Sequence, residues 1–302
     1  PRTVTPAETS GREQADQAGE ASSSDGSGSP SPGGRTAGGS GLSGASSTAG
    51  GHDQRSFDFD GTDSESSSSQ PGNPAIQVPA GKGPDTIPHN AGETSTATGI
   101  PLDTLSGAGE YELVDTIADL DRWIETARKA GRFAFDSETN SLNPMVAEPV
   151  GFSISTDMRN GCYIPLSGPN GTVLEADPVR KRLRDLFRDP SVGVVGQNLK
   201  YDAAVLARWG APIERIAFDT MIAAWLIDTT QGTYGMDRMA ERFLDYRTVH
   251  YRDLFPNLKG SGKLEGHSFA EVPLEQAVHY AAEDADITYR LYRVLDVLLD
   301  TR

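Results

Sequence analysis

The distribution of apolar residues along the chain limits its fold more than any other feature. Of the 302 residues, those at 1–110 are dominated by Ser, Gly, Thr, Pro and acidic residues, and their sparse apolar residues follow no period. Such a stretch cannot bury enough apolar surface to offset the entropy lost on ordering. Residues 111–302 have the apolar density of one compact domain. We therefore expect a disordered, acidic linker at 1–110 and one folded domain at 111–302.

The charge and the cysteine content narrow the class of protein. The formal net charge is -16 and the lone cysteine is Cys162, so neither an intramolecular disulfide nor a cysteine-based zinc site is expected. No stretch of about 18 apolar residues is present to cross a membrane. An acidic chain is a poor partner for nucleic acid, but much of the excess lies in the linker. Bound cations would also reverse the sign of the charge where a phosphate must sit.

Residues 111–302 alternate between strand and helix patterns. Strands are expected at 132–136, 150–155, 162–166 and 192–196, and helices at 116–130, 177–187, 197–209, 220–227, 236–243 and 273–299. Asp177, followed by Pro178, is the expected cap of the second helix. The first three strands, joined by short turns, indicate an antiparallel meander, and the later alternation indicates parallel strands. We expect an α/β fold with a mixed central sheet and helices on both faces.

Acidic residues stand in three short motifs of this half. Asp136 and Glu138 are two residues apart at the end of an apolar strand, so both project from one face of it. Asn198 and Asp202 are four residues apart in a helical pattern, which predicts that they share a helical face. Each pattern taken alone is weak evidence for a catalytic site, because acidic pairs at such spacings are common on solvent-facing surfaces. Asn198 after a strand is also typical of a helix cap.

The third motif lies in the long last helix. Tyr280 and Asp284 are again four residues apart, whereas Glu283 and Asp286 fall on other faces of the helix and are expected to be solvated or paired. Four carboxylates gathered in one cleft would repel one another unless cations were bound. The combination of the three motifs therefore predicts a site for divalent metal.

Together the motifs resemble the DEDD group of 3′–5′ exonucleases, in the variant whose third motif is Tyr-x-x-x-Asp. The likeness is closest to the proofreading domain of bacterial DNA polymerase I, and it covers nearly all of 111–302. The segments that carry it are Phe133-Ala134-Phe135-Asp136, Val195-Gly196-Gln197-Asn198-Leu199-Lys200-Tyr201-Asp202, Ile216-Ala217-Phe218-Asp219-Thr220-Met221 and Tyr280-Ala281-Ala282-Glu283-Asp284-Ala285-Asp286. The resemblance implies the ribonuclease-H-like three-layer fold.

The same resemblance implies a two-metal mechanism. Asp136, Glu138 and Asp284 would hold one divalent ion, and Asp136 would bridge to a second ion that Asp202 reaches. Mg²⁺ is the expected ion because it prefers oxygen ligands, with Mn²⁺ as the alternative. Tyr280 would orient the attacking water together with Glu138, so these four acids and Tyr280 are the expected catalytic residues.

The resemblance also implies how a strand is bound. Leu142 and Tyr251 would flank the terminal bases, and Tyr251 stands where the family usually has Phe. Asn198 and Tyr201 would contact the strand or support the second motif. On the sequence alone, core packing is an equal alternative for Leu142. The implied reaction is hydrolysis of the 3′-terminal phosphodiester of single-stranded or frayed DNA, which releases a nucleoside monophosphate.

The implied partners are the 3′ end of single-stranded DNA and, in the full chain, a 5′-nuclease domain before this segment and a polymerase domain after it. No membrane partner is expected, and the implied place is the cytoplasm of a bacterium, at the nucleoid. Two alternatives stay open: a freestanding exoribonuclease of the ribonuclease D type, and an inactive module that supports a polymerase. Several basic residues are expected to follow the strand's backbone, namely Lys200, Arg247, Arg252, Lys259 and Lys263.

Overall fold

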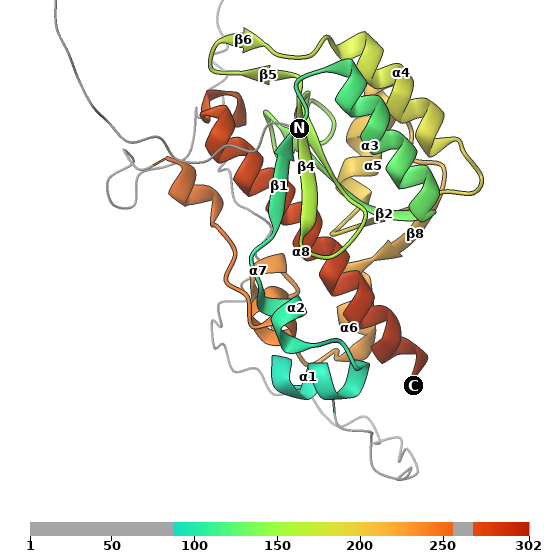
Figure 1. Ribbon diagram of the computed structural model, residues 1–302, viewed down its shortest axis with the longest axis vertical. Coiled ribbons are helices and arrows are strands. Elements are labelled where there is room, and N and C mark those ends of the chain that lie inside the picture. Colours follow the sequence, from blue (N-terminus) through green and yellow to red (C-terminus); the bar gives the residue numbers. More distant parts are fainter. Residues whose placement is uncertain (1–86, 256–267, 302) are drawn as a thin grey trace, which may run out of the picture. The chain divides into compact units, whose positions relative to one another are not determined.

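The structure is a computed structural model, and it describes residues 87–255 and 268–301. Within these residues a mixed sheet has the strand order β1-β4-β3-β2-β7-β8 (Figure 1). Its strands are β1 (Glu110–Leu113), β2 (Arg132–Thr139), β3 (Pro149–Ser155), β4 (Asn160–Pro165), β7 (Gly193–Gly196) and β8 (Ile216–Asp219). Strands β2, β3 and β4 are antiparallel, whereas β7 and β8 run parallel to β2. The predicted meander and the predicted parallel strands are both confirmed.

Two smaller features of the sheet are not predicted by the sequence. β1 pairs in parallel with β4, at the edge of the meander. Its residues, Glu110–Leu113, alternate between acidic and apolar, and none of them is fully buried, so the pattern resembles a loop as much as a strand. A short hairpin, β5 (Ser167–Gly168) with β6 (Gly171–Thr172), follows β4 as a separate sheet.

Helices cover both faces of the sheet, because the side chains of β2 alternate between two apolar clusters. Phe133 and Phe135 point into the cluster formed with helices on one face, and Ala134 points to the other face, where it meets Tyr289 and Tyr292 of the last helix. The helices of the first face are α3 (Ile117–Ala130), α4 (Ala176–Phe187) and α5 (Lys200–Trp209). Those of the second are α6 (Thr220–Ile227) and α8 (Leu274–Asp300). The predicted α/β, ribonuclease-H-like three-layer fold is confirmed.

Capping residues set both ends of α3. Thr116 accepts a hydrogen bond from the N–H of Asp119 at the start of α3, and Gly131, with φ 71°, ends it. The predicted cap of α4 is wrong. The helix begins at Ala176, with Glu175 before it and no side-chain cap, and Asp177 pairs instead with Arg180. Pro178 fits because N–H groups of the first helical turn have no intrahelical partner to lose.

The predicted helix at 236–243 is present but changes its winding. α7 (Met236–Met239) continues as the π-helical segment η1 (Ala240–Leu244). The N–H of Tyr246 donates to the carbonyl of Ala240 at 3.2 Å, and Asp245 has φ 52°. Short 3₁₀ turns follow at η2 (Tyr251–Leu254) and η3 (Phe269–Glu271). After η1 the chain reaches α8, where Tyr246 and Val249 bond to Glu283.

The folded part begins earlier than residue 111. Two short helices, α1 (Ala91–Thr98) and α2 (Leu102–Ser106), lie inside the stretch that the composition assigns to the linker. Leu105 is fully buried in the cluster that α6 and α8 share, and its carbonyl accepts a hydrogen bond from Arg290 at 2.8 Å. Contacts with distant helices order this segment, although its own composition gives it little tendency to fold. The rest of the predicted linker, residues 1–86, lies outside the described residues.

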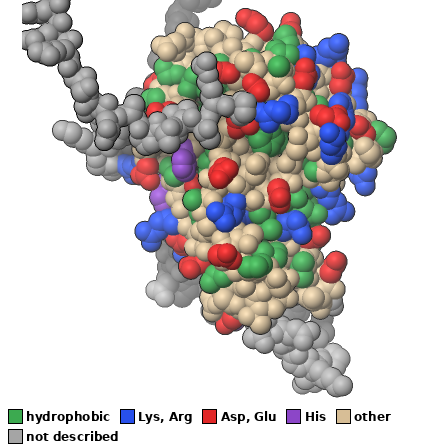
Figure 2. All heavy atoms as spheres, viewed as in Figure 1, with side chains coloured by type: hydrophobic (Ala, Val, Ile, Leu, Met, Phe, Trp, Pro, Cys, Tyr) green, Lys and Arg blue, Asp and Glu red, His purple; other side chains and the backbone are tan. Residues whose placement is uncertain are grey.

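Charged side chains on the face shown in Figure 2 are mixed in sign. Over α3 and α4, Lys and Arg side chains are interleaved with Asp and Glu. Arg182 pairs with Asp121 at 2.6 Å, and Arg128 pairs with Asp189 at 3.4 Å. Lys259 and Lys263 lie outside the described residues. Of the helices that the structure describes, none is both long and apolar enough to traverse a lipid bilayer.

Candidate active site

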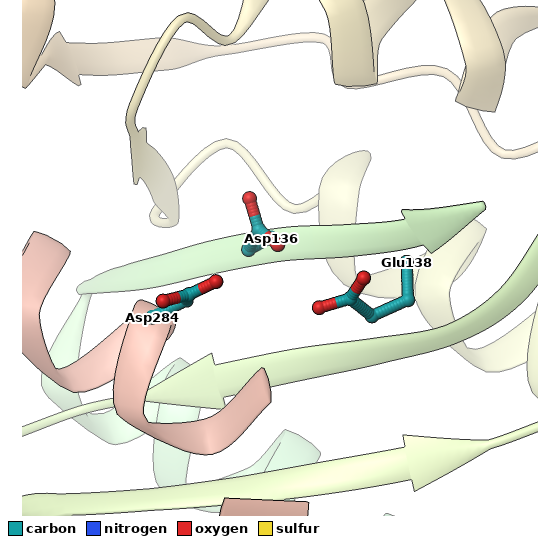
Figure 3. A group of neighbouring side chains, drawn as sticks. All are labelled: Asp136, Glu138 and Asp284. Carbon is teal, nitrogen blue, oxygen red and sulfur yellow. The ribbon is translucent and has the colours of Figure 1, made fainter. Parts of the chain in front are cut away.

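Three of the predicted acids converge at one end of the sheet (Figure 3). Asp136 and Glu138 come from the last part of β2, and Asp284 comes from α8. One carboxylate oxygen from each lies within 4.8 Å of the corresponding oxygens of the other two. Glu138 and Asp284 are buried, and Asp136 is half-buried. An arrangement of this size allows the three groups to share one bound ion.

The close approach of α8 to the meander brings Asp284 to β2. Small side chains line this part of the helix, namely Ala281, Ala282 and Ala285, all fully buried. On the facing strand, a Cβ added to Gly161 would lie 2.7 Å from the carbonyl oxygen of Ala282. No larger residue fits at position 161 without moving the helix. The third motif therefore lies against the sheet through its alanines, and its carboxylate reaches the end of β2.

Asp202 adjoins this group from α5. It is buried, and the hydroxyl of Ser137 donates a hydrogen bond to its Oδ1 at 2.5 Å. This bond joins β2 to α5, because Ser137 and Asp202 lie far apart in the sequence. Burial raises the pKa of Asp202 well above its ordinary value, and the negative charge of Asp136 raises it further. Asp202 is thus near enough to Asp136 for their charges to interact, but it is outside the group of three whose oxygens lie within 4.8 Å of one another.

Burial and mutual repulsion raise the pKa values of these carboxyl groups. Burial raises the pKa of Asp136 to about 6 from its ordinary 3.8. It also raises the pKa of Glu138 and of Asp284 well above the usual range, and in both the charge of Asp136 adds to the effect. Without cations the site therefore takes up protons.

The donor atoms fit a hard divalent cation. Oε1 of Glu138 is buried and has no hydrogen-bond partner among the described residues. A buried, unpaired carboxylate oxygen is costly, and a bound ion would satisfy it. All the candidate ligands are carboxylate oxygens, the kind that Mg²⁺ and Mn²⁺ prefer. The residues of the site therefore suit the predicted metal.

The second motif differs from its predicted geometry. Asn198 has φ 57°, in the left-handed region that Asn tolerates better than most residues, and it precedes α5. It shares no helical face with Asp202, so that prediction is wrong, and it makes no side-chain cap bond with the helix. Its Oδ1 is buried without a partner in the described part of the chain.

Asp219 holds this turn in place, a role that motif spacing does not reveal. Its carboxylate accepts the N–H of Leu199 at 2.9 Å and that of Asn198 at 3.3 Å. The same side chain caps α6 by accepting the N–H of Met221 at 3.0 Å. An Asp directly before a helix is a recognisable cap in sequence, but its bonds to a second, distant turn are not.

Tyr201 supports the turn that follows β2. Its hydroxyl is 2.6 Å from Oγ1 of Thr139 and donates to the carbonyl of Ser141 at 2.5 Å. This turn carries Leu142, whose side chain is 37% exposed. Core packing, the alternative for Leu142, is therefore wrong. The structure places Leu142 at the surface, next to a turn that Tyr201 fixes.

Aromatic residues lie beside the acids. The ring centroids of Tyr280 and Tyr251 are 6.0 Å apart with the rings edge to face, and Phe269 lies 5.8 Å from Tyr280. Burial, followed by the charges of Asp284 and Glu138, raises the pKa of Tyr280 well above its ordinary value. Its phenol therefore keeps its proton at neutral pH and can donate a hydrogen bond.

The other two acids of the third motif are paired, as predicted. Glu283 accepts hydrogen bonds from the hydroxyl of Tyr246 and the N–H of Val249. Asp286 forms a fully buried ion pair with Arg290 and also accepts from the hydroxyl of Tyr111 at 2.9 Å. Both point away from the group formed by Asp136, Glu138 and Asp284, so neither is a candidate metal ligand.

Comparison with known proteins shows which family of proteins the chain belongs to. Residues 111–300 match the family model described as 3′–5′ exonuclease. The chain belongs to this family of nucleases, which are hydrolases. Within the family the predicted likeness is confirmed, because the matched region is similar to the exonuclease region of bacterial DNA polymerase I.

Two curated relatives illustrate the likeness. DNA polymerase I of Rhizobium leguminosarum is 41% identical over 207 residues, which cover 61% of this chain and 20% of the relative. DNA polymerase I of Treponema pallidum is 37% identical over 232 residues, which cover 64% of this chain and 22% of the relative. The chain thus spans about a fifth of the length of these relatives. Among solved structures, Brucella melitensis NrnC aligns with a TM-score of 0.48 and 23% identity, over 64% of this chain and 83% of that one.

Proposed function

We propose that this chain is a two-metal 3′–5′ exodeoxyribonuclease that acts as the proofreading part of a DNA polymerase I. Its reaction is hydrolysis of the 3′-terminal phosphodiester of single-stranded or frayed DNA, with release of nucleoside monophosphates. The observation that carries the proposal is the convergence of Asp136, Glu138 and Asp284 in a member of the 3′–5′ exonuclease family. Asp202, whose pKa is raised by burial and by the charge of Asp136, supplies the fourth carboxylate.

The residues divide into two metal sites. Asp136, Glu138 and Asp284 would hold one divalent ion, and Asp136 and Asp202 would hold the other. When bound, two such ions, Mg²⁺ or Mn²⁺, stabilise the charge that develops on the attacking and leaving oxygens of a displacement at phosphorus. The raised pKa values of the acids support this assignment, because a site that gathers protons when empty exchanges them for cations on binding.

Tyr280 and Glu138 position the attacking water. The Tyr280 phenol keeps its proton, so it donates a hydrogen bond to the water oxygen and fixes its direction. Glu138, with one buried oxygen free of hydrogen bonds from the described residues, can accept from the same water. A phenol that stays protonated is a poor general base, so Tyr280 acts by orientation.

The surrounding residues hold the strand. Tyr251 lies against Tyr280, and Leu142 is exposed on the turn after β2, so both can flank the terminal bases. Asn198 contributes its amide oxygen, which has no hydrogen-bond partner among the residues described, and Tyr201 fixes the turn that carries Leu142. A mispaired end is preferred because it has already lost its pairing energy and enters the site as a single strand.

The relatives support a larger protein. Because the chain matches about a fifth of DNA polymerase I, we propose a polymerase domain on the C-terminal side and a 5′-nuclease domain on the N-terminal side. The exonuclease domain then comprises 111–302 together with α1 and α2, and the residues before them serve as a linker. The proposed location is the bacterial cytoplasm, at the nucleoid, where the 3′ ends of nascent DNA are found.

Degradation of end-labelled oligonucleotides tests this function. The chain is incubated with 5′-labelled single-stranded DNA or RNA of the same sequence, in Mg²⁺ or in chelator. We expect ladders that shorten from the 3′ end of DNA, only with metal. Asp136→Ala and Asp202→Ala should each lower the rate by about 10³, the scale of losing a principal electrostatic stabiliser.

Asp115→Ala is the matched control, because it removes an exposed acid next to α3 that belongs to none of the three motifs. It should retain the wild-type rate. If either Asp136→Ala or Asp202→Ala digested DNA at the wild-type rate, the assignment of these acids to the active site would be wrong. Preference for RNA over DNA would instead favour the exoribonuclease alternative, and lack of any metal-dependent cleavage would favour the inactive module.

A further inference from the structure

A segment of six residues, 246–251, connects η1 to η2 and passes beside α8 near the proposed site. We call it the strap. Residues of the strap bond to two different acids. Tyr246 and Val249 bond to Glu283 of α8, whereas Thr248 and His250 bond to Asp237 of α7. The strap is therefore held on two sides, and its last residue is Tyr251.

Glu283 makes the more deeply buried of these two attachments. Its side chain is 1% exposed, and each of its oxygens accepts one hydrogen bond of 2.7 Å, from the Tyr246 hydroxyl and from the Val249 N–H. Both oxygens are thus engaged with the strap and not with the other acids. Hydrogen bonds to a buried, charged acceptor are stronger than those between neutral or exposed groups.

The attachment to Asp237 is more exposed. Asp237 accepts from the hydroxyl of Thr248 at 2.6 Å and contacts Nδ1 of His250 at 2.9 Å. The side chains of Asp237 and His250 are 49% and 54% exposed. Water and salt screen such a pair, so it adds little to the order of the strap. Glu283 is therefore the main anchor.

The strap places Tyr251 against the catalytic residues. The ring of Tyr251 meets that of Tyr280 edge to face at 6.0 Å, and Tyr280 lies on α8 one turn before Glu283. Asp284 is the next residue of the same helix. One helix thus carries a metal-ligand candidate, a water-orienting tyrosine and the anchor of the strap.

We propose that Glu283 is a positioning residue, which holds Tyr251 in place to stack on the 3′-terminal bases and so sets the affinity for the strand. The inference rests on the proposed function, since it assigns a task within the same site. Glu283 touches neither the substrate nor the ions. It acts through the strap, and without it Tyr251 would sample orientations that do not meet a base.

Replacement of Glu283 separates anchoring from charge. In Glu283→Ala the Tyr246 hydroxyl and the Val249 N–H lose their acceptor, so KM for a single-stranded oligonucleotide should rise about tenfold or more, the effect of losing hydrogen bonds to a charged group. The value of kcat should change by less than about threefold, because Asp136, Glu138 and Asp284 remain. In Glu283→Gln the amide oxygen can accept from Val249 and the amide nitrogen can donate to the Tyr246 oxygen, so KM should return to within about twofold of wild type.

Two further variants locate the effect in the strap. Tyr246→Phe removes one of the two bonds and keeps the ring, so its KM should fall between those of wild type and Glu283→Ala. Tyr251→Ala removes the stacking ring itself. If Glu283 acts through Tyr251, adding Glu283→Ala to Tyr251→Ala should raise KM by less than about twofold, because coupled residues are not additive.

Glu275→Ala is the control, since it makes the same substitution at an exposed position of the same helix and should leave KM unchanged. Thermal unfolding in chelator shows whether each variant folds. If Glu283→Ala does not fold, the two single variants Tyr246→Phe and Glu283→Gln replace it in the test. The inference would be overturned if Glu283→Ala and Tyr251→Ala had additive effects on KM. If Glu283→Ala is unfolded, additive effects of Tyr246→Phe and Tyr251→Ala would overturn it instead. So would a wild-type KM in Glu283→Ala and Tyr246→Phe. Loss of metal-dependent cleavage in the wild-type chain would instead refute the proposed function.

Discussion

The carboxyl group of Asp136 should make the metal-free protein less stable as the pH rises. Burial raises its pKa to about 6 in the folded state from an ordinary value of 3.8. Between these two values the folded state binds a proton that the unfolded state has released. The free energy of unfolding therefore falls with rising pH across this window. Above it the loss is complete and amounts to about 3 kcal/mol, at about 1.36 kcal/mol for each pKa unit.

Asp136→Asn removes this dependence, because an amide does not titrate. In chelator the variant should be close in stability to wild type at about pH 4 and more stable by about 2 to 3 kcal/mol at about pH 8. Urea unfolding at both pH values measures the difference, and titrating groups that do not interact with Asp136 cancel between the two proteins. The neighbouring acids Glu138, Asp202 and Asp284 add to the difference in the same direction, because the charge of Asp136 also raises their pKa values. The sign is unusual, since replacing a proposed catalytic residue is expected to stabilise the fold.

Asp115→Asn is the matched control for this experiment, because it exchanges an exposed acid and should give the same difference from wild type at both pH values. The reasoning is refuted if Asp136→Asn also shows a difference that does not change with pH. Such a result would mean that Asp136 is well solvated or already paired in the folded state, and that the carboxylates of the site do not repel one another.

Three further outcomes follow from the structure. Mg²⁺ should raise the melting temperature at about pH 8, and much less at about pH 5, where protons compete for the same oxygens. The rise should be smaller in Asp136→Asn, and differential scanning fluorimetry with and without chelator measures it. Leu105→Ala should cost about 2 to 5 kcal/mol of unfolding free energy in urea, because Leu105 is fully buried, and no loss would mean that α2 is not part of the fold. Arg290→Met should cost about 3 to 5 kcal/mol, since it leaves the buried charge of Asp286 without its partner; wild-type stability would show that Asp286 is satisfied without Arg290.

Local patterns predicted the elements that carry the site. The apolar run before Asp136 and the 3.6-residue period of the last helix were sufficient to place β2 and α8. The same patterns failed where a distant contact overrides a local preference. Asn198 fits a helix by its spacing, but Asp219 holds its backbone N–H in a turn. Leu105 lies in a segment poor in apolar residues, and it is buried because it joins the cluster formed by α6, η1 and α8.

Some functional candidates carry no local signal at all. Ser137 looks like a turn residue, yet its hydroxyl bonds to Asp202 in another element. Glu283 is expected from its spacing to be solvated or paired, but its partners lie in a strap that no periodicity predicts. In both cases the packing of separate elements decides which group is the hydrogen-bond partner, and no local sequence pattern predicts that contact.

The amino-acid sequence alone determined which residue types are available and on which side of a strand or helix each one projects, because backbone geometry fixes the periods of 2 and 3.6. It also determined the family, because residues 111–300 match the 3′–5′ exonuclease family model. Only the tertiary structure decided that β2 and α8 meet, close enough for Asp136, Glu138 and Asp284 to lie within reach of one ion. That meeting depends on small side chains, above all Gly161 against Ala282, which let a helix approach a sheet.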